Sequence, residues 1–405
     1  MKKTPVCARP LAPLLLAVVL AFSAAAARAD DEDAPWKIRW DDTFKLDSPD
    51  GRFKLQFGGR LELDATFAGA GDAIEAAFGP VTDGTEVRRA RPYVAGTLYE
   101  RVEFKLEYDF ASGDAVATDL YVGLKDTAIG GVRLGHFKEP FSLEEVTSEK
   151  YNAFVERSLP SVFNPVRNVG VMAYDAGERY TWAAGAFRES DEFAVSSGSG
   201  VLNLTGRVTG VPVYRDDAHL LHLGLGVSRK DLGDDLFRFR QRPEAHQAPR
   251  FVDTGAFAAA QVRLWDLELA LVWGAFWAAA ELAGAEADAV HLGDPSFRGS
   301  YVQAGWFLTG QHRPYRRGHG DFHRLKLAAS ESFGGGGRGA WEVAVRWSTL
   351  DLDDAAVAGG ELDDVTVGLN WYLNSVTRFM LNVVRSDVAG VGEADFVLLR
   401  VQVEL

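Results

Sequence analysis

The chain has 405 residues, and its 42 glycines, 47% hydrophobic and 11% aromatic residues make a turn-rich composition that excludes a disordered protein. Acidic residues outnumber basic ones by 57 to 43, which gives a formal net charge of −14. Two or three domains would be usual for this length, but a large β-barrel of this size can form a single domain.

The first 29 residues have the three parts of a secretory signal peptide. Lys2 and Lys3 precede an apolar run that Pro13 interrupts, and the run ends in small residues up to Ala29. We therefore expect cleavage near Ala29 rather than a membrane anchor. Removing this segment takes four positive charges and no negative one from the net charge of −14, which leaves about −18. It also removes Cys7, the only cysteine of the sequence.

From residue 53 onward, apolar and polar residues alternate in one segment after another. The pattern is clear at residues 53–67, 103–110, 221–228, 341–348, 365–373 and 397–405. Successive side chains of a β-strand point to opposite faces, so each segment predicts a strand with one apolar and one polar face. Stretches rich in Gly, Asp and Pro separate the segments, and no later run is long and apolar enough for a membrane helix. The sequence therefore predicts an all-β chain.

The polar faces of these strands bear on the choice between two all-β folds. They carry arginines, lysines and carboxylates, whereas tryptophans recur on the apolar faces, at Trp273, Trp277, Trp306, Trp341, Trp347 and Trp371. A polar interior and an apolar exterior with interfacial aromatic residues are typical of a transmembrane antiparallel β-barrel. A β-sandwich with one solvated face per sheet shows the same alternation, but the signal peptide and the cysteine-free mature chain favour the barrel. We expect a short N-terminal periplasmic segment at residues 30–50 and the barrel at residues 51–405.

Three arginines stand close together early in the second predicted barrel strand. Arg89 and Arg91 lie on its polar face, and the same test of parity places Arg60 and Arg133 on polar faces of other strands. An arginine that faces lipid at mid-membrane costs about 2–4 kcal/mol, so we expect these four to face the lumen. Arg88 has the opposite parity and is expected at a bulge or at the barrel rim.

A second basic cluster lies in the stretch "LFRFRQRPEAHQAPRF". Arg238, Arg240 and Arg242 recur at every second residue, so they point to one side if the stretch is extended. Such a row of guanidiniums could pass an oxyanion from one set of donors to the next, as in anion-selective pores. The alternative is a solvated surface loop, which is common for runs of charge.

No pattern predicts catalysis or a bound group. The histidines are not spaced as metal ligands, and the run "FGGGGRG" lacks the Lys-Ser/Thr of a phosphate-binding loop. Ser142 and Ser161 have no recognisable neighbouring base. We therefore expect no enzymatic activity, no cofactor and no metal site.

The stretch "RRARPYVAGTLYERVEFKLEYDFA" resembles the phosphate-selective porin O/P family. The resemblance continues in order through "VRLGHFKEPFSLEEVTSEKYNAFVERSLPSVFNPVRNVGV", "FRFRQRPEAH" and "VTVGLNWYLNSVTRFMLN", and it covers nearly all of the mature chain. It implies an outer-membrane barrel of about sixteen strands, usually a homotrimer, with loops folded into the lumen. It also implies a row of arginines that guides phosphate or similar anions, which falls here on Arg60, Arg88, Arg89, Arg238, Arg240 and Arg242.

Two acidic residues depart from the family pattern. Glu145 follows the run "FSLE" where phosphate-specific members have a lysine, and Glu103 aligns with a second pore lysine of those members. Carboxylates at these positions would oppose the arginines and lower the preference for anions. The chain also ends in Leu405 where the family usually has phenylalanine.

These features together predict an outer-membrane porin that favours anions such as phosphate or polyphosphate. Its expected partners are small anions and outer-membrane lipid, with no nucleic acid. Two alternatives stay open: a general or weakly selective diffusion porin, and a structural outer-membrane barrel without transport.

Overall fold

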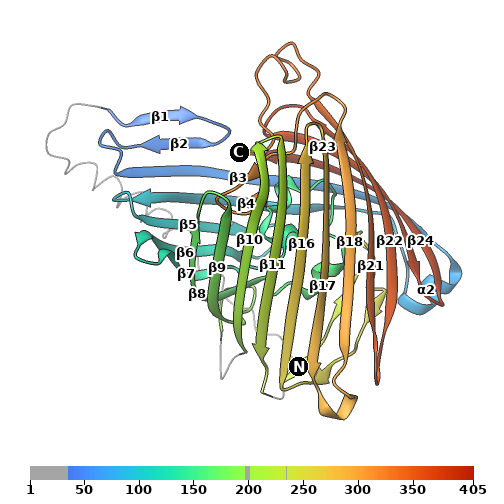
Figure 1. The fold of residues 1–405 in the computed structure, drawn as a ribbon. Coiled ribbons are helices and arrows are strands. Elements are labelled where there is room, and N and C mark those ends of the chain that lie inside the picture. The colour runs from blue at the N-terminus through green and yellow to red at the C-terminus, as the bar shows by residue number, and fades with distance from the viewer. Residues whose placement is uncertain (1–34, 197–200, 234) are drawn as a thin grey trace, which may run out of the picture.

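The computed structural model describes residues 35–196, 201–233 and 235–405, so the predicted signal peptide and its cleavage site lie outside the described residues. In this part of the chain, eighteen strands form one continuous sheet (Figure 1). Two of them are an N-terminal hairpin, and the other sixteen form an antiparallel ring. The ring closes because its last strand pairs with its first, with Leu399 opposite Ala65. The predicted sixteen-stranded barrel is confirmed.

Each strand of the ring pairs with the next one along the chain, so the topology is a simple meander. The barrel strands are β3 (Phe53–Ala70), β4 (Gly84–Leu98), β5 (Val102–Asp109), β6 (Val116–Thr127), β7 (Gly130–Lys138), β8 (Arg167–Ala176), β9 (Tyr180–Arg188), β10 (Leu202–Asp216), β11 (His219–Asp231), β16 (Gln261–Trp273), β17 (Phe276–Asp288), β18 (Ser296–Phe307), β21 (Ala340–Asp354), β22 (Val357–Tyr372), β23 (Thr377–Val388) and β24 (Gly392–Glu404).

The side chains of the barrel are arranged with apolar residues outside and polar residues inside. On β3, Leu61 and Leu63 are 41% and 44% exposed, whereas Glu62 and Asp64 are buried. The alternation is the same along β22, where Val365 is exposed and its neighbours are buried. This arrangement is the reverse of a soluble core and is what a lipid environment requires of a closed barrel. The polar lumen predicted from strand parity is confirmed.

One tryptophan contradicts the predicted aromatic exterior. Trp273 and Trp306 are exposed on the outer face, but Trp277 is fully buried on the lumen side of β17. Its indole Nε1 donates to a carboxylate oxygen of Glu342 at 2.7 Å, and the Arg313 guanidinium lies 3.8 Å from a ring centre of the same indole. The error has a simple cause, because β17 begins Phe-Trp-Ala-Ala-Ala and alanines on both faces hide its parity.

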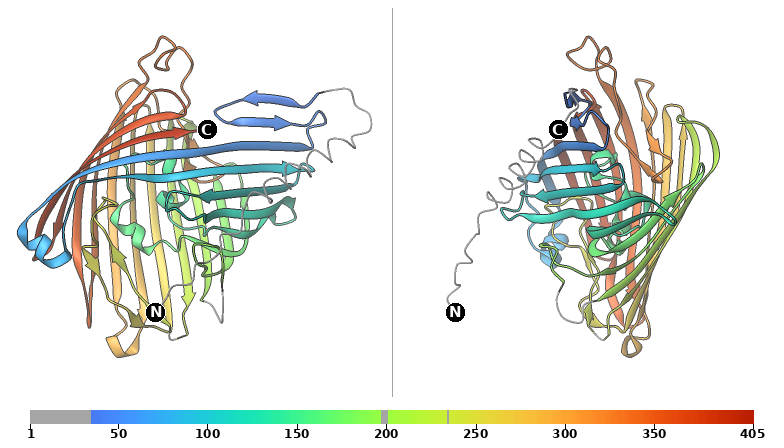
Figure 2. Two further views of the ribbon diagram at one scale, coloured as in Figure 1. Left: turned by 180° about the vertical axis from the view of Figure 1, so that it is seen from behind. Right: turned by 90° about the vertical axis from the view of Figure 1, so that its left-hand side faces the viewer.

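The N-terminal hairpin consists of β1 (Lys37–Trp40) and β2 (Phe44–Asp47). β2 pairs with the first residues of β3, with Phe44 opposite Phe57, so the hairpin extends the sheet beyond the point where β24 ends. Figure 2 shows it at the same end of the barrel as the C-terminus. Most connections at this end are short turns, which is the usual arrangement at the periplasmic end of an outer-membrane barrel. None of the helices in the described part of the chain is long and apolar enough to cross a membrane.

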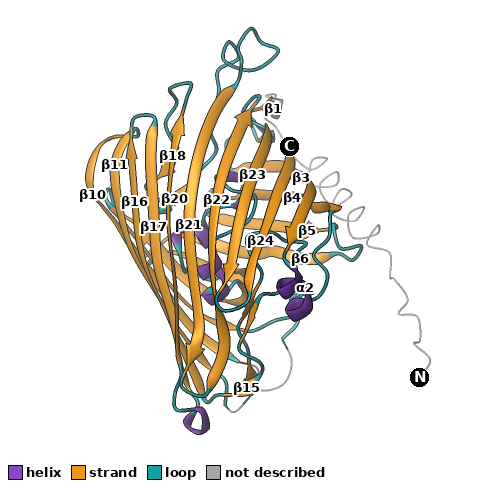
Figure 3. Ribbon diagram, turned by 90° about the vertical axis from the view of Figure 1, so that its right-hand side faces the viewer, coloured by secondary structure: helices purple, strands orange, loops and turns teal. Residues whose placement is uncertain are grey.

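Three long connections enter the lumen, and Figure 3 shows short helical turns inside the ring of strands. Loop 139–166 and loop 232–260 come from the end with the longer connections, and loop 308–339 comes from the periplasmic end. The short elements between the barrel strands are α2 (Asp72–Phe78), α3 (Leu143–Val146), η1 (Glu149–Tyr151), η2 (Leu159–Phe163), β12 (Leu236–Phe237), β13 (Arg240–Gln241), β14 (Val252–Asp253), β15 (Phe257–Ala258), η3 (Val290–Leu292), β19 (Tyr315–Arg316) and β20 (Asp321–Phe322).

Hydrogen bonds to the barrel wall hold loops 232–260 and 308–339 inside. In loop 232–260, the Glu244 carboxylate accepts a hydrogen bond from the Ser348 hydroxyl of β21 at 2.6 Å. In loop 308–339, the Tyr315 hydroxyl lies 2.6 Å from Nδ1 of His222 on β11. The expectation that loops fold into the lumen is therefore confirmed.

Candidate functional site

Loop 139–166 begins with a buried carboxylate that fixes its direction. Glu139 directly follows β7 and accepts hydrogen bonds from the side-chain amides of Asn168 and Asn203, each at 2.8 Å, and from the hydroxyl of Thr205. Because these partners lie on β8 and β10, the chain leaves the wall toward the lumen at this point. A buried carboxylate is stable only with such a set of donors.

The far wall of the barrel holds the next part of the loop. The Glu281 carboxylate of β17 accepts from the Ser142 hydroxyl at 2.6 Å and from the Glu144 backbone N–H at 2.7 Å. Arg346 of β21 is buried and donates to Glu144 at 3.1 Å, and Arg400 of β24 donates to the Val155 carbonyl at 2.6 Å. Loop 139–166 therefore spans the lumen and narrows it.

A cavity of about 250 Å³ lies between loop 139–166, loop 232–260 and β4. Its lining is strongly charged. The cations are Arg88, Arg89, Arg157, Arg240, Arg242 and Arg250, and the carboxylates are Glu145, Glu149 and Glu156. The two basic clusters of the sequence, which are about 150 residues apart in the chain, thus meet at one point of the lumen. We call this space the constriction cavity.

Arg88 and Arg89 face the lumen together because β4 has an irregularity there. Glu62 of β3 lies opposite Arg89, and the next residue of β3 lies opposite Val87, so Arg88 is the extra residue of a bulge. The Arg88 guanidinium donates to both carboxylate oxygens of Glu156, at 3.0 and 3.1 Å. In a regular strand Arg88 would face the lipid, because it has the opposite parity to Arg89. The bulge turns it toward the lumen, as predicted.

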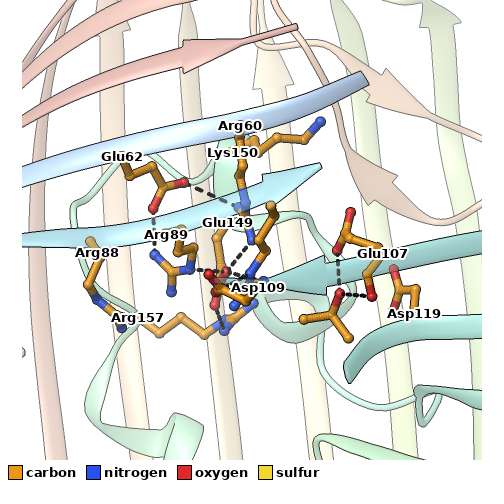
Figure 4. A network of polar contacts seen from close by, with 12 residues as sticks. Arg60, Glu62, Arg88, Arg89, Glu107, Asp109, Asp119, Glu149, Lys150 and Arg157 are labelled. Atoms are coloured by element: carbon orange, nitrogen blue, oxygen red, sulfur yellow. Dashed lines mark hydrogen bonds and ion pairs between the residues drawn. The ribbon is translucent and has the colours of Figure 1, made fainter. Parts of the chain in front are cut away.

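Arg60 and Arg89 converge on Glu149, which projects from η1 of loop 139–166 (Figure 4), and Arg91 is a third guanidinium near it. The Glu149 Oε2 atom lies 2.9 Å from Arg60, 2.8 Å from Arg89 and 3.6 Å from Arg91. Burial would raise the pKa of Glu149, but the guanidiniums of Arg89, Arg157 and Arg60 hold it well below its usual value. Glu149 is therefore a stable carboxylate among arginines.

The arginines of loop 232–260 differ from those of the wall. Within residues 35–196, 201–233 and 235–405, Arg240, Arg242 and Arg250 form no ion pair, and Arg242 donates to the carbonyl of Ala248 at 2.7 Å. The three arginines line one cavity, where burial and then the charges of Arg242 and Arg240 lower the pKa of Arg250. Arg238, in contrast, is 44% exposed outside the cavity and is paired with Asp253.

Arg133 and Glu103 lie away from the constriction cavity. The Arg133 guanidinium donates to Glu103 at 3.0 Å and stacks 4.1 Å from the ring centre of Tyr121. The Tyr174 hydroxyl also donates to Glu103, at 2.8 Å. This cation and this carboxylate satisfy one another, and neither lines the cavity.

Glu145 does line the cavity, but it forms ion pairs with Lys138 and Arg157 and not with the arginines of β3 and β4. Its carboxylate lies 3.1 Å from Lys138 and 3.3 Å from Arg157. The carboxylate that opposes the wall arginines is Glu149. Neither Glu149 nor three further residues of the cavity lining, Glu156, Arg157 and Arg250, was predicted from the sequence. These residues lie in loops, and the alternation that assigns strand residues to the lumen or to the lipid does not apply there. Their charge alone therefore did not indicate that they face the cavity.

Residues 58–403 match the protein family described as phosphate-selective porin O and P. Porin O of Pseudomonas aeruginosa is 24% identical over 413 residues, which cover 92% of this chain and 91% of that protein. An uncharacterized protein of Caulobacter vibrioides is 32% identical over 403 residues, which cover 95% of this chain and 78% of that protein.

Two solved structures illustrate the shared fold. Vibrio cholerae OmpT with loop L8 deleted aligns with a TM-score of 0.57 at 12% identity and covers 87% of this chain and all of that one. The anion-selective porin from Comamonas acidovorans aligns with a TM-score of 0.54 at 12% identity and the same coverage. Both likenesses concern the barrel architecture. The match of the family over most of the chain goes further, and this protein is an outer-membrane porin that belongs to the phosphate-selective porin O and P family.

Proposed function

We propose that this porin is a passive channel that favours small anions such as phosphate or polyphosphate over cations. The observation that carries the proposal is the set of unpaired arginines in the constriction cavity. Arg240, Arg242 and Arg250 face a space of about 250 Å³, and no carboxylate in the described part of the chain lies within ion-pair distance of them. A ring of guanidiniums at a narrow point concentrates anions and repels cations.

The pairing of the wall arginines favours a second candidate, a weakly selective diffusion porin. Arg60, Arg89 and Arg91 are bound to carboxylates and contribute little net charge to the lumen. In this interpretation, the arginines of loop 232–260 supply a modest anion preference, and the passage of solutes depends mainly on size. The structural alternative, a barrel without transport, has no specific observation in its favour.

Single-channel recording in a planar bilayer with a salt gradient tests these proposals. An anion-favouring pore gives a reversal potential of the sign expected for chloride permeation, and added phosphate reduces the chloride current. A weakly selective pore gives a reversal potential close to zero. The absence of conductance from a correctly assembled protein would contradict both and support the structural barrel.

We also propose that the mature protein begins after Ala29 and assembles as a homotrimer. The family resemblance and the fold support this assembly, and one of the similar solved structures is a trimer form of Vibrio cholerae OmpT. The expected product is an oligomer that is extracted from the outer membrane by detergent and converts to monomer on heating. Recovery as a soluble periplasmic monomer would contradict this proposal.

A further inference from the structure

We propose that the Glu149 carboxylate occupies an oxyanion-binding site of this pore and competes with permeating anions for it. Four guanidiniums form the site, those of Arg60, Arg89, Arg91 and Arg157, and Figure 4 labels all of them except Arg91. This inference rests on the proposed anion pathway and names a residue that limits its selectivity. The chemical class that the site would take is a small tetrahedral oxyanion, such as inorganic phosphate or sulfate.

The geometry around Glu149 is that of a bound anion. Three guanidiniums of the wall converge on a single atom, Oε2, at 2.9 Å from Arg60 Nη2, 2.8 Å from Arg89 Nε and 3.6 Å from Arg91 Nη1. The fourth, Arg157 Nη1, lies 2.6 Å from Oε1 on the loop side. A single carboxylate surrounded in this way by cations from three chain segments takes the place that a free oxyanion would take.

The site has more donors than Glu149 can use. In the described part of the chain, Arg89 Nε and Arg91 Nη1 are buried nitrogens without a partner of hydrogen-bond geometry, although both face Oε2. A carboxylate presents two oxygens in one plane, and an unmade hydrogen bond at a buried donor is unfavourable. A phosphate ion presents four oxygens in a tetrahedron and could accept from guanidiniums that approach from several directions.

Glu149 contacts all four guanidiniums of the cluster. The four guanidiniums contact four carboxylates, those of Glu62, Asp109, Glu145 and Glu149. The other three carboxylates lie on strands or on α3, at the edge of the arginine cluster. Glu62 also contacts Arg400 and Glu145 also contacts Lys138, whereas Glu149 lies between the four arginines. Neutralising Glu149 would make the surroundings of the constriction cavity more positive by one charge, and a permeating anion would experience that change.

Glu149 is placed where exchange with a free anion is possible. Its side chain is 15% exposed and lines the constriction cavity together with Arg89 and Arg157, so an anion in the cavity can reach two of the four guanidiniums directly. The backbone of the loop is held on either side of it, at Glu144 by Glu281 and at Val155 by Asn382. The carboxylate can therefore change its rotamer without release of the loop.

The test is the substitution Glu149→Gln in the full-length porin, which keeps the shape of the side chain and removes its charge. Chloride current through single channels is recorded while inorganic phosphate is added. Loss of the competing carboxylate is expected to lower the half-blocking phosphate concentration at least about tenfold, since one charge-assisted hydrogen bond is worth that much. Sulfate should act like phosphate, and acetate, with only two oxygens, should block less.

Glu107→Gln is the matched control. Glu107 also faces the lumen and pairs with Lys105 at 3.0 Å, but Lys105 keeps its second partner, Asp119, at 2.6 Å. This variant therefore loses one negative charge without exposing a cation, and its phosphate block should stay near the wild-type value. The inference would be overturned if Glu149→Gln had the same half-blocking phosphate concentration as the wild type. It would also be overturned if Glu149→Gln and Glu107→Gln lowered this concentration equally.

The wild-type reversal potential separates this inference from the proposed function. A wild-type pore without anion preference contradicts the proposed function. Tighter phosphate block in Glu149→Gln, but not in Glu107→Gln, would still support an oxyanion-binding site that Glu149 occupies. If Glu149→Gln does not assemble, Glu149→Asp keeps the charge and shortens the side chain by one methylene. A carboxylate drawn back from the wall arginines should allow a smaller increase in phosphate block, and no increase would refute the inference.

Discussion

Arg240 and Arg238 stand two residues apart in the same basic row, and the structure predicts different consequences for their loss. Arg240 lines the constriction cavity and has no ion pair in the described part of the chain, whereas Arg238 is 44% exposed and paired with Asp253. We predict that Arg240→Gln lowers the preference for anions and that Arg238→Gln changes it much less. Because the two substitutions remove the same charge from the same loop, each serves as a control for the other.

The size of the effect follows from the dimensions of the cavity. A volume of about 250 Å³ corresponds to a sphere of about 4 Å radius, so an ion at its centre lies roughly 6 Å from the charge of a lining guanidinium. At this distance a unit charge contributes about 0.7 kcal/mol in water and about 3 kcal/mol at an effective dielectric constant of about 20. An intermediate value of about 1 kcal/mol changes the local anion concentration about fivefold.

The assay is the reversal potential of single channels under a gradient of potassium chloride. We expect Arg240→Gln to reduce the permeability ratio of chloride to potassium roughly 25-fold, because the lost charge lowers the local chloride concentration and raises that of potassium by about fivefold each. The oligomers should keep normal heat resistance, because exposed charges contribute only about 0–1 kcal/mol to stability. Equal shifts in the two variants would mean that the whole row acts through long-range potential. No shift in either would mean that ions do not pass along this loop, and the anion pathway would have to be abandoned.

Three further predictions concern the network that surrounds the cavity. Arg346→Ala leaves two buried carboxylates unpaired, so it should destabilise the folded barrel by about 3–5 kcal/mol, seen as a lower temperature of monomerisation and unfolding. Glu145→Gln should raise the anion preference because Glu145 lines the cavity, whereas Glu103→Gln should not, and identical reversal potentials would refute this distinction. The lowered pKa of Glu149 means that its stabilising contribution is complete above its ordinary pKa of 4.5 and is lost only as the pH falls below it. Heat resistance of the oligomer should therefore be constant from pH 7 to pH 5.5 and decline at more acidic pH. A decline that begins above pH 5.5 would show that the ionised form of Glu149 is less stabilised than its contacts suggest.

Strand periodicity made much of the fold predictable from the sequence. Arg60 and Arg89 could be placed in the lumen because an arginine on the lipid face would be too costly, and the structure places them there. Periodicity gives no direction where the two faces of a strand are alike or where the chain forms no strand. Alanine-rich β17 has no contrast between its faces, so Trp277 was assigned to the wrong side. Glu149 lies in a loop, where no period links sequence position to direction.

The partners of the arginines could not be predicted for a related reason. Which carboxylate meets which guanidinium depends on how loop 139–166 crosses the barrel, and the loop path is set by contacts such as those of Glu139 and Glu281 with residues far away in the sequence. Sequence position alone therefore points to Glu145 as the acid opposed to the wall arginines. The structure assigns that position to Glu149, four residues later in the same loop.

This distribution of charge also indicates how the selectivity of such a pore can change. Removing a wall arginine such as Arg89 takes from the buried Glu62 its shortest ion pair, at 2.7 Å, and leaves it the contacts with Arg60 at 3.3 Å and Arg400 at 3.6 Å. Breaking a buried ion pair costs up to about 3–5 kcal/mol. Replacing a carboxylate on the loop, such as Glu149, leaves arginines that retain other partners on the wall and can also be satisfied by solute anions. A change of selectivity is therefore less damaging to the barrel when it occurs at the acids of loop 139–166 than at the arginines of the strands. The acidic character of the whole chain is no obstacle, because charges beyond about 8 Å are largely screened at physiological salt and the permeating ion responds to the residues that line the cavity.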